Sequence, residues 1–382
     1  KDFLECEDTL YTINALRKIG VEISINRGDL EIQGRGGRFS HGSIRKEIYL
    51  GNSGTSFRLL LSVVALCSGE FFITGAKRMK NRPIGPLVAS LSRLGVDSSW
   101  VDVDGCPPVL IRAKGIQGGR VSMEGNQSSQ FLSSLLLSGP YADNDIKIEI
   151  IGDLVSQPYV DMTLDVMRAF GVEVFRDGYR GFKVNAGNGY RPHQFSIEAD
   201  VTNASYFWAA AGVTGGKVIT ENIAPFCTRQ GDIRFLDILE EMGCQVKKEA
   251  DRVTVCGGTL SGIEADMSAM PDLVPTLAAV ALFTDGKTVI RNVPHLRHKE
   301  SDRLRTVRLE WERIGGRIEE LSDGLIIHGE KPLSGAVVDP HEDHRLAMSL
   351  AVIGLRSPGI KIKNEGCVRK SFPQFWDLWD LL

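Results

Sequence analysis

The chain has 382 residues, of which 42% are hydrophobic and 24% are charged, and its formal net charge is −3. This composition is ordinary for a soluble globular protein, and the length exceeds one hydrophobic core, so we expect two domains. The near-neutral total gives no support for binding to nucleic acid or to an anionic membrane, and a basic site would have to be local.

Seven cysteines are scattered along the chain, and no two of them have the CxxC spacing of a zinc site. We therefore expect neither a metal site nor a disulfide framework, and reduced thiols indicate a cytoplasmic protein. The longest apolar stretch, residues 59–66, is much shorter than a membrane span. Residues 1–10 carry acids and lack a long apolar region, so no signal peptide is expected.

Taken in chain order, one kind of predicted element recurs: a helix that ends in a hydrophobic residue and a glycine, followed by a short strand. It occurs at residues 15–25, 90–101, 166–175, 239–248 and 311–321. The glycines of these copies, spaced 75, 76, 72 and 72 residues apart, are Gly20, Gly95, Gly171, Gly243 and Gly315. We expect each of them just past a helix C-terminus, where a positive φ disfavours any side chain.

A second kind of element alternates with the first and is an Ala- and Leu-rich helix that leads through a turn into a strand. Its copies begin near residues 55, 128, 203, 271 and 344. Because these helices are apolar nearly all round, we expect them to be buried. Together the two kinds make a repeated unit of about 74 residues with two helices and roughly four strands.

The size of this unit favours two lobes, residues 1–198 and residues 199–382. The alternative is a linear solenoid, but its repeats usually have roughly 20–50 residues. The first unit has no apolar helix before residues 8–19, and residues 372–382 resemble only the start of another unit. The repeat therefore predicts either that a sixth unit is split or that residues are missing before Lys1.

Polar clusters stand at corresponding places, near the N-termini of the apolar helices, where free N–H groups favour anions. In the first half these clusters are residues 51–58, 78–83, 128–130 and 156–161. The first is rich in small residues but lacks the Lys-Ser/Thr pair of a Walker A loop. Each cluster alone is explained at least as well by a capped helix or a solvated loop as by a binding site.

Further clusters in the second half contain both cations and carboxylates. Cations at equivalent ends of elements across both halves are Arg82, Lys299, Arg303, Arg345 and Lys370. Asp272 and Glu300 place carboxylates beside them. Surface ion pairs and helix caps would explain each cluster by itself. Together the clusters predict a site for two polyanionic substrates with acid–base catalysis.

The motifs that carry this chemistry are GNSGTSFR, KNRPIG, SSQFLSSLL, LVSQPYVDMTL, MPDLVPTLA, KESDRL, EDHRLAM and RKSFPQF. They resemble, in order, the motif series of the 5-enolpyruvylshikimate-3-phosphate synthases, a family of enolpyruvyl transferases, from about Asp8 to the end. The resemblance implies an α/β (α+β) fold, a two-lobed inside-out α/β barrel. Each lobe would hold three repeated βαβαββ units, one of them incomplete, with the site between the lobes.

The resemblance also implies the reaction and its ligands. Phosphoenolpyruvate would give its enolpyruvyl group to the 5-hydroxyl of shikimate 3-phosphate by addition and elimination, and phosphate would be released. No metal or other cofactor is expected. Glyphosate would compete with phosphoenolpyruvate. The protein would be a monomer that acts on small molecules, without nucleic acid or membrane.

The family's functional residues carry over by motif. The residues implied to bind shikimate 3-phosphate are Ser128, Ser129, Gln130, Ser156, Tyr159, Asp272, His295 and Lys299. Those implied to bind phosphoenolpyruvate are Gly54, Arg82, Gln130, Arg303, Arg345 and Lys370. The residues implied to be catalytic are Asp272 as proton acceptor, Glu300 as proton donor, and Lys299. His295 stands where some members of the family have asparagine.

One departure concerns a Lys-Ser-x-Ser-x-Arg segment that binds both substrates in the family and that this sequence does not contain. We therefore expect the isolated chain to bind and turn over poorly unless a complementing peptide of about 45 residues is supplied. The alternatives are an inactive fragment, one half of a split synthase, or a UDP-N-acetylglucosamine enolpyruvyl transferase. The last uses a reactive cysteine, and none lies between Gly75 and Arg82.

Overall fold

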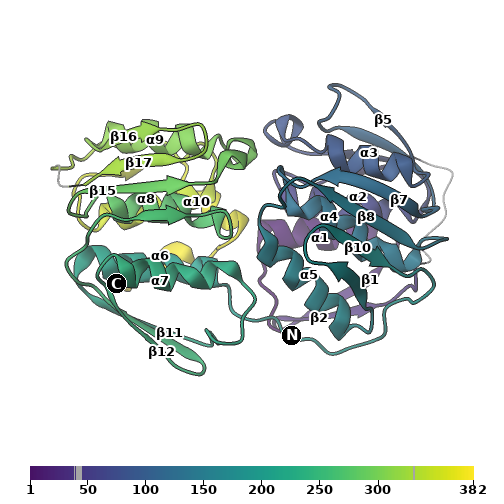
Figure 1. Cartoon of the computed structure of the whole chain (residues 1–382), viewed down its shortest axis with the longest axis horizontal. Helices are drawn as coiled ribbons and strands as arrows, with labels where there is room; N and C mark the ends of the chain where they lie inside the picture. Colours follow the sequence, from purple (N-terminus) through teal and green to yellow (C-terminus); the bar gives the residue numbers. More distant parts are fainter. Residues whose placement is uncertain (38, 40–44, 330–331) are drawn as a thin grey trace. The chain divides into compact units, whose positions relative to one another are not determined.

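The computed structural model describes residues 1–37, 39, 45–329 and 332–382. It divides into two compact units, Lys1–Ile197 and Glu198–Leu382, and each unit has its own buried hydrophobic core (Figure 1). Both units combine helices with several separate sheets, so the predicted α/β class is confirmed.

The first unit contains two four-stranded sheets of the same design. Its elements are α1 (Glu7–Lys18), β1 (Glu22–Asn26), β2 (Asp29–Gln33), β3 (Lys46–Tyr49), α2 (Gly54–Ala65), β4 (Ser68–Thr74), α3 (Gly85–Arg93), β5 (Asp97–Trp100), β6 (Val109–Lys114), β7 (Gly119–Glu124), α4 (Ser129–Ser138), β8 (Ile146–Ile151), α5 (Gln157–Ala169), β9 (Val174–Asp177) and β10 (Gly181–Val184). The sheets have the orders β3-β4-β6-β5 and β7-β8-β10-β9, beside a β1-β2 hairpin. In both, the first two strands are parallel and the other pairs are antiparallel.

The second unit repeats this design once in full. Its elements are α6 (Val201–Thr214), β11 (Lys217–Glu221), α7 (Phe235–Glu241), β12 (Gln245–Lys248), β13 (Arg252–Cys256), β14 (Glu264–Asp266), α8 (Val274–Ala281), β15 (Lys287–Arg291), α9 (Arg303–Arg313), β16 (Arg317–Glu320), β17 (Leu325–His328), β18 (Val337–Val338), α10 (His344–Gly354), β19 (Lys361–Ile362) and α11 (Phe375–Trp379). The sheet β14-β15-β17-β16 has the same order and the same pattern of parallel and antiparallel pairs. The other sheets are β11-β13-β12 and β18-β19.

The repeated glycines occupy the conformation predicted for them. Their φ angles are 94° for Gly20, 90° for Gly95, 84° for Gly171, 115° for Gly243 and 95° for Gly315. Each follows a helix within two residues of its end and precedes a strand or an extended segment. A side chain is disfavoured at these angles, so the glycines allow the chain to turn sharply from helix to strand.

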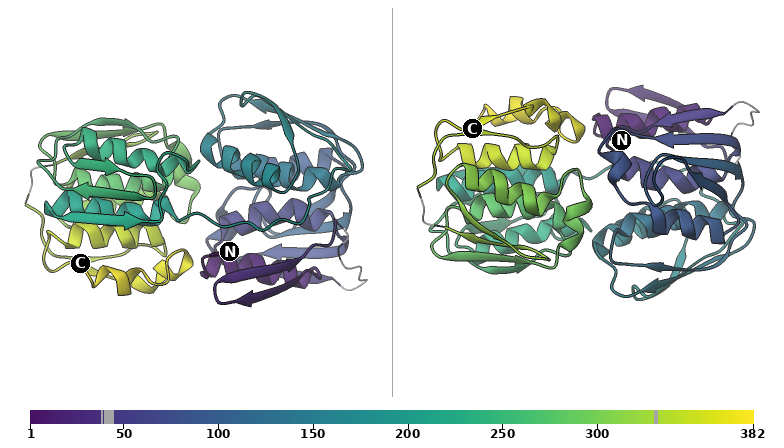
Figure 2. Two further views of the ribbon diagram at one scale, coloured as in Figure 1. Left: turned by 90° about the horizontal axis from the view of Figure 1, so that it is seen from below. Right: turned by 90° about the horizontal axis from the view of Figure 1, so that it is seen from above.

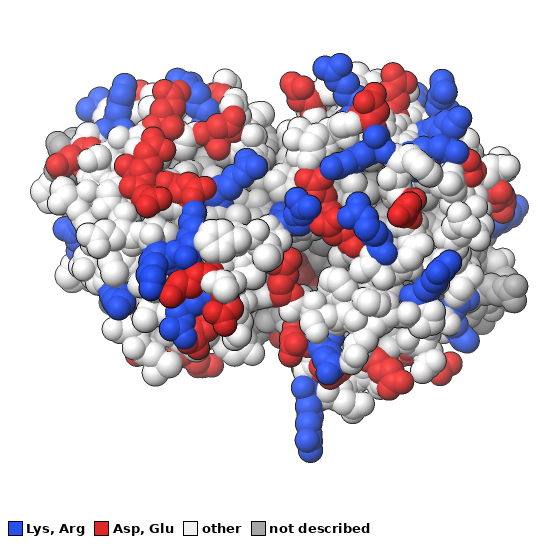
Figure 3. Space-filling model, turned by 60° about the horizontal axis from the view of Figure 1, so that its bottom comes forward, with Lys and Arg blue, Asp and Glu red and all other residues white. Residues whose placement is uncertain are grey.

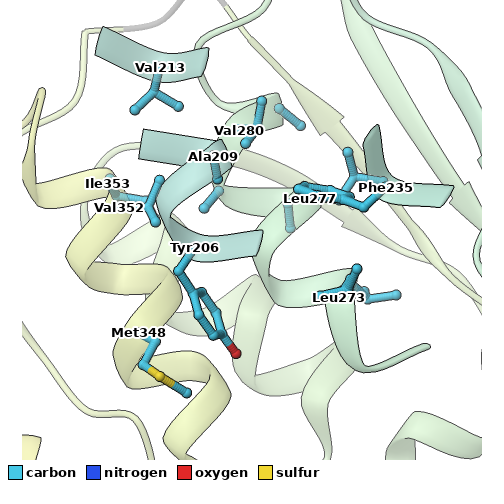
Figure 4. Packing of buried hydrophobic residues seen from close by; sticks show 14 of the residues in the cluster. Tyr206, Ala209, Val213, Phe235, Leu273, Leu277, Val280, Met348, Val352 and Ile353 are labelled. Atoms are coloured by element: carbon cyan, nitrogen blue, oxygen red, sulfur yellow. The ribbon is translucent and has the colours of Figure 1, made fainter. Parts of the chain in front are cut away.

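The apolar helices form the centres of the cores. In the second unit, α6, α8 and α10 pack against one another and run side by side in both views of Figure 2. All of α8 is buried, and Figure 4 shows Leu277 of this helix beside Phe235 of α7 and Val280 near Ala209 of α6. In the first unit, α2 packs against α4 in the same way. The predicted burial of these helices is therefore confirmed.

Polar side chains begin several of these buried helices and close their first turns. Ser53, Ser128, Asp200 and Asp343 each accept a hydrogen bond from a backbone N–H in the first turn of α2, α4, α6 and α10. Such caps satisfy N–H groups that have no partner within the helix. They also hold polar residues at the edge of each core, where the sequence predicts the site.

The outer surface carries charges of both signs. On the face shown in Figure 3, Lys and Arg side chains are interspersed with Asp and Glu side chains on both units. No helix within the described ranges is long and apolar enough to cross a membrane.

Candidate functional site

A buried arginine is the centre of a charged cluster in the second unit. Arg303 is the first residue of α9 and is only 1% exposed. Its guanidinium lies 2.8 Å from Oδ1 of Asp272, 2.9 Å from Oε2 of Glu300 and 2.8 Å from Oδ2 of Asp343. Burial lowers the pKa of Arg303, but the carboxylates of Asp343, Glu300 and Asp272 outweigh that effect and raise its pKa above the ordinary value.

Asp343 joins the start of α10 to this arginine. Its Oδ1 accepts a hydrogen bond from the backbone N–H of Arg345 at 3.1 Å, which caps α10. Its Oδ2 accepts hydrogen bonds from Nε of Arg303 and from the Ser301 hydroxyl at 3.1 Å. Asp343 belongs to the motif EDHRLAM but was not predicted among the site residues, because a capping aspartate has no visible second role in the sequence.

Asp272 stands in the single turn that precedes α8 and meets three cations. Besides Arg303, its carboxylate lies 2.9 Å from Nη2 of Arg345 and 3.3 Å from Nζ of Lys299. Burial raises the pKa of Asp272, but Arg345, Lys299 and Arg303 hold it well below the ordinary value. This carboxyl is therefore ionised at neutral pH and can accept a proton.

Glu300 connects the same cluster to the end of the chain. Its Oε1 lies 3.3 Å from Nζ of Lys370, and its Oε2 receives the hydrogen bond from Arg303. The structure thus brings together six residues predicted for the site in the second half of the chain: Asp272, Lys299, Glu300, Arg303, Arg345 and Lys370.

Two buried histidines lie next to these charges. His295, which is 5% exposed, makes no hydrogen bond through either ring nitrogen to the residues described. Burial, and then Lys299, lower its pKa to about 4. Burial also holds the pKa of His344 well below the ordinary value, with Lys370 and Arg345 acting in the same direction. Both rings are therefore neutral at pH 7.

Tyr206 reaches the cluster from the neighbouring helix α6. Its hydroxyl accepts a hydrogen bond from Nη1 of Arg345 at 3.4 Å. In Figure 4 its ring lies beside Met348 of α10, and its hydroxyl is directed away from the apolar side chains. Burial raises the pKa of Tyr206 to about 12, so it stays protonated. This residue was not predicted, since a tyrosine in an apolar helix resembles any core residue.

The first unit contains a second set of predicted residues around Arg82. Nη1 of this buried arginine donates a hydrogen bond to the carbonyl of Asn52 at 2.9 Å. Gly54, the first residue of α2, lies directly against the guanidinium. A Cβ on Gly54 would be 2.6 Å from Cζ of Arg82, which is closer than real Cβ atoms approach other atoms. Only glycine therefore allows this arginine to lie where it does.

Gln130 is held from both ends of its amide. Nη1 of the buried Arg58 donates to Oε1 of Gln130 at 2.8 Å, and Nε2 of Gln130 donates to the Thr55 hydroxyl at 2.8 Å. Ser128 caps the same helix by accepting from the Gln130 N–H at 3.3 Å, and Ser129 is buried in its first turn. Arg58 lies at the end of the small-residue cluster 51–58, but it was not predicted to have a role in the site.

Ser156 immediately precedes α5 in an unusual backbone conformation. Its φ of 55° and ψ of 43° are left-handed, although it is not glycine, and it is 9% exposed. Left-handed non-glycine residues are uncommon and gather at functional sites. Tyr159 follows in the first turn of the helix.

Among the residues described, no group of three or more His, Cys, Asp and Glu side chains is arranged to hold a metal ion. What the second unit offers instead is four cations in contact with three carboxylates. Such an arrangement can bind anions and transfer protons with its own side chains.

Comparisons with known proteins point in one direction. The family model described as EPSP synthase (3-phosphoshikimate 1-carboxyvinyltransferase) matches residues 1–379. A 3-phosphoshikimate 1-carboxyvinyltransferase of Vibrio vulnificus is 40% identical over 379 residues, which are 98% of this chain and 88% of the relative. One of Syntrophobacter fumaroxidans is 43% identical over 381 residues, covering 99% of this chain and 89% of the relative. A solved EPSP synthase from Acinetobacter baumannii matches with a TM-score of 0.79 at 29% identity, covering 99% of this chain and 88% of that chain.

Proposed function

Because the chain belongs to the EPSP synthase (3-phosphoshikimate 1-carboxyvinyltransferase) family, we propose how its residues share the reaction of that family. The enzyme transfers the enolpyruvyl group of phosphoenolpyruvate to the 5-hydroxyl of shikimate 3-phosphate and releases phosphate. The observation that carries the assignment of residues is the contact of one buried guanidinium, that of Arg303, with three carboxylates.

Asp272 accepts the proton of the attacking hydroxyl, and Lys299 contacts the hydroxyls of shikimate 3-phosphate beside it. Support for this role comes from the position of Asp272, whose Oδ1 lies 3.3 Å from Nζ of Lys299, and from its three cationic neighbours, which keep the carboxyl ionised. A base must be ionised and within reach of the proton that it removes. His295, neutral and close to both residues, contacts the same substrate.

Glu300 donates a proton to the methylene carbon of phosphoenolpyruvate. The carboxylate of Glu300 is paired with Arg303 and Lys370. We propose that the phosphate and carboxylate of phosphoenolpyruvate bind these two cations together with Arg345, which brings the substrate to Glu300.

The first unit supplies the remaining contacts. Ser128, Ser129 and Ser156 hold the phosphate of shikimate 3-phosphate, with Tyr159 beside them. Gln130 contacts both substrates. Arg82 and Gly54 form part of the phosphoenolpyruvate site, and glyphosate competes there. Two of these assignments are supported by the start of α4, where the Ser128 hydroxyl and the amide of Gln130 are already held in place.

We also propose the finer architecture of the enzyme, its oligomeric state and its location in the cell. Each lobe is built as an inside-out barrel from three βαβαββ units, and the boundary lies at residues 198 and 199. The enzyme acts as a monomer in the cytoplasm, and a peptide bearing Lys-Ser-x-Ser-x-Arg increases its activity. The fold proposal is supported by the strand order that recurs in β3-β4-β6-β5, β7-β8-β10-β9 and β14-β15-β17-β16.

The test is release of inorganic phosphate by the full chain when both substrates are present, with and without that peptide. Activity should require both substrates, and Glu300→Gln should abolish most of it. Glu312→Gln, at an exposed carboxylate of α9 that pairs with Arg308, is the matched control and should be as active as the unchanged chain. Equal loss in both variants would contradict the role of Glu300.

A separate measurement tests binding without turnover. A ligand that binds only the folded chain raises its thermal unfolding temperature. Shikimate 3-phosphate should do so in the unchanged chain and less in a Ser129→Ala variant. If the unchanged chain released no phosphate under any condition and gained no stability from either substrate, the proposed function would be wrong.

A further inference from the structure

The segment that leads into α10 has a strained backbone. Residues 339–342 connect β18 to α10, which begins with the capping Asp343 and carries Arg345. His341 and Glu342, two consecutive residues of this segment, have φ angles of 53° and 58°. Neither is glycine, and both are exposed. A left-handed pair of this kind persists only where the surrounding structure holds it in place.

A buried glutamate of α9 makes the contacts that hold this turn. Glu310 is 1% exposed and lies two helical turns after Arg303. Its Oε2 accepts a hydrogen bond from the backbone N–H of Asp339 at 2.9 Å, and its Oε1 lies 3.3 Å from Nε2 of His341. Asp339 in turn accepts from the N–H of His341 at 2.8 Å. The turn is thus fixed to α9 on its inner side.

Burial of this carboxylate needs compensation, and part of that compensation comes from the turn. A buried charge is costly unless it is paired and hydrogen-bonded. Glu310 has one cation of its own helix, Arg313, whose Nε lies 3.2 Å from Oε2. Among the described residues, its other polar contacts are to the turn itself. The side chain therefore links the helix that begins with Arg303 to the segment that begins α10.

We propose that Glu310 is a positioning residue for Arg345 and Asp343. By holding residues 339–342 in the left-handed turn, it sets the point at which α10 begins. Asp343 then reaches Nε of Arg303 at 2.8 Å, and Arg345 reaches Asp272 at 2.9 Å. The inference rests on the proposed function, because Arg345 is taken to bind phosphoenolpyruvate.

If Glu310 loses its charge, the turn should relax toward ordinary backbone angles, and the start of α10 should move. Arg345 would then bind the anion in a poorer position. A misplacement of about 1 Å can cost about 10- to 100-fold in an enzyme's performance. The groups proposed to transfer protons, Asp272 and Glu300, are not removed. We therefore expect the loss mainly in the KM for phosphoenolpyruvate.

The first experiment is steady-state kinetics of Glu310→Gln in the full chain. The KM for phosphoenolpyruvate should rise about 10- to 100-fold, while the kcat and the KM for shikimate 3-phosphate change much less. The matched control is Glu312→Gln on the same helix, which should leave all three constants unchanged. An unchanged KM for phosphoenolpyruvate in Glu310→Gln, or equal changes in both KM values, would overturn the inference.

The second experiment asks whether the strained turn is the link. Glycine takes up left-handed angles without cost, so Glu342→Gly should restore most of the lost affinity when it is combined with Glu310→Gln. Glu342→Val alone should raise the KM for phosphoenolpyruvate, because a β-branched residue disfavours these angles. Glu342 is exposed, so this pair of variants tests the turn even if Glu310→Gln does not fold.

The outcomes separate the two proposals. If the unchanged chain releases no phosphate with or without the complementing peptide and gains no stability from either substrate, the proposed function fails. If it is active but Glu342→Val and Glu342→Gly have the same KM for phosphoenolpyruvate, the positioning role fails. Failure of glycine to restore the affinity of Glu310→Gln would show that Glu310 acts only on general stability.

Discussion

Nη1 of Arg303 lies 2.8 Å from Oδ1 of Asp272, so a residue proposed to bind phosphoenolpyruvate is bonded to the proposed proton acceptor. Arg345 and Lys299 contact the same carboxylate. Each substitution in this cluster therefore changes the surroundings of the others, and their effects should not add.

Asp272→Asn keeps the shape of the side chain but removes the charge that accepts a proton. General acid–base groups contribute about 10²- to 10⁴-fold to rates, and we expect kcat to fall by that amount. Steady-state phosphate release measures it. Asp237→Asn, at an exposed carboxylate that pairs with Lys248, is the control and should retain full activity. A kcat for Asp272→Asn within a few-fold of the unchanged chain would exclude the role.

Gly54→Ala would place a methyl group against the guanidinium of Arg82. The arginine must move, and a lost hydrogen bond to a charged group weakens binding by about tenfold or more. The KM for phosphoenolpyruvate should rise accordingly, with a smaller effect on shikimate 3-phosphate. Gly34→Ala is the control, since a Cβ there meets no atom within 4 Å. Equal kinetics for the two variants would mean that Arg82 does not contact this substrate.

At Ser156, two variants can distinguish the effect of the side-chain hydroxyl from the effect of the backbone conformation. Ser156→Gly and Ser156→Ala both remove the hydroxyl, but only glycine relieves the left-handed φ of 55°. If the hydroxyl binds phosphate, both variants should raise the KM for shikimate 3-phosphate about tenfold. The glycine variant should also be at least as stable as the unchanged chain in thermal unfolding. A rise in only one variant would assign the effect to the backbone instead.

The buried histidines should make stability depend on pH. The pKa of His295 is about 4 in the folded chain, against an ordinary value near 6.5. Between about pH 6.5 and 4 the unfolded chain binds a proton there that the folded chain does not, so the free energy of unfolding falls as the pH is lowered. His344 acts in the same direction.

At pH 4 the low pKa of His295 should reduce the free energy of unfolding by up to about 3 kcal/mol relative to neutral pH. Urea unfolding at several pH values should show a smaller slope for His295→Asn than for the unchanged chain. His193→Asn, at an exposed histidine, should leave the slope as it is. If His295→Asn also left it unchanged, the folded ring would take up its proton as easily as the unfolded one.

Gly243 should be less replaceable than Gly215. Both follow helices and have positive φ angles, 115° and 73°. A Cβ on Gly215 meets nothing within 4 Å, whereas one on Gly243 collides with the carbonyl of Thr259. We expect Gly215→Ala to lower the free energy of unfolding by about 1–2 kcal/mol and Gly243→Ala to lower it further. The midpoints of urea unfolding, with unchanged m values, measure both losses of stability. Equal losses would show that the segment at Thr259 moves to make room for the added Cβ.

The sequence predicted those structural features that depend on residues close together along the chain. The positive φ angles of Gly20 and Gly315 and the burial of the apolar helices follow from local patterns. The order of the strands in each sheet does not follow from local patterns, because β6 pairs with β4 across an intervening helix and strand. Hydrogen bonds between such distant segments leave no mark on the sequence of either one.

The same distinction divides the site. The motifs indicated which cations and carboxylates to expect, but not the double role of Asp343, whose partner Arg303 is 40 residues away. Arg58 and Tyr206 were missed for a similar reason. Each lies within an apolar helix, and only the folded chain brings it to Gln130 or to Arg345.

The separate sheets have a consequence for how the chain opens. Among the residues described, no strand is shared between sheets, so backbone hydrogen bonds in one sheet do not depend on those in the next. The packed helices α6, α8 and α10 are what connect the sheets of the second unit. Individual sheets can therefore fray while the helices stay protected. The slowest amide protons to exchange with solvent should belong to the helices, and the β18-β19 pair should exchange among the fastest.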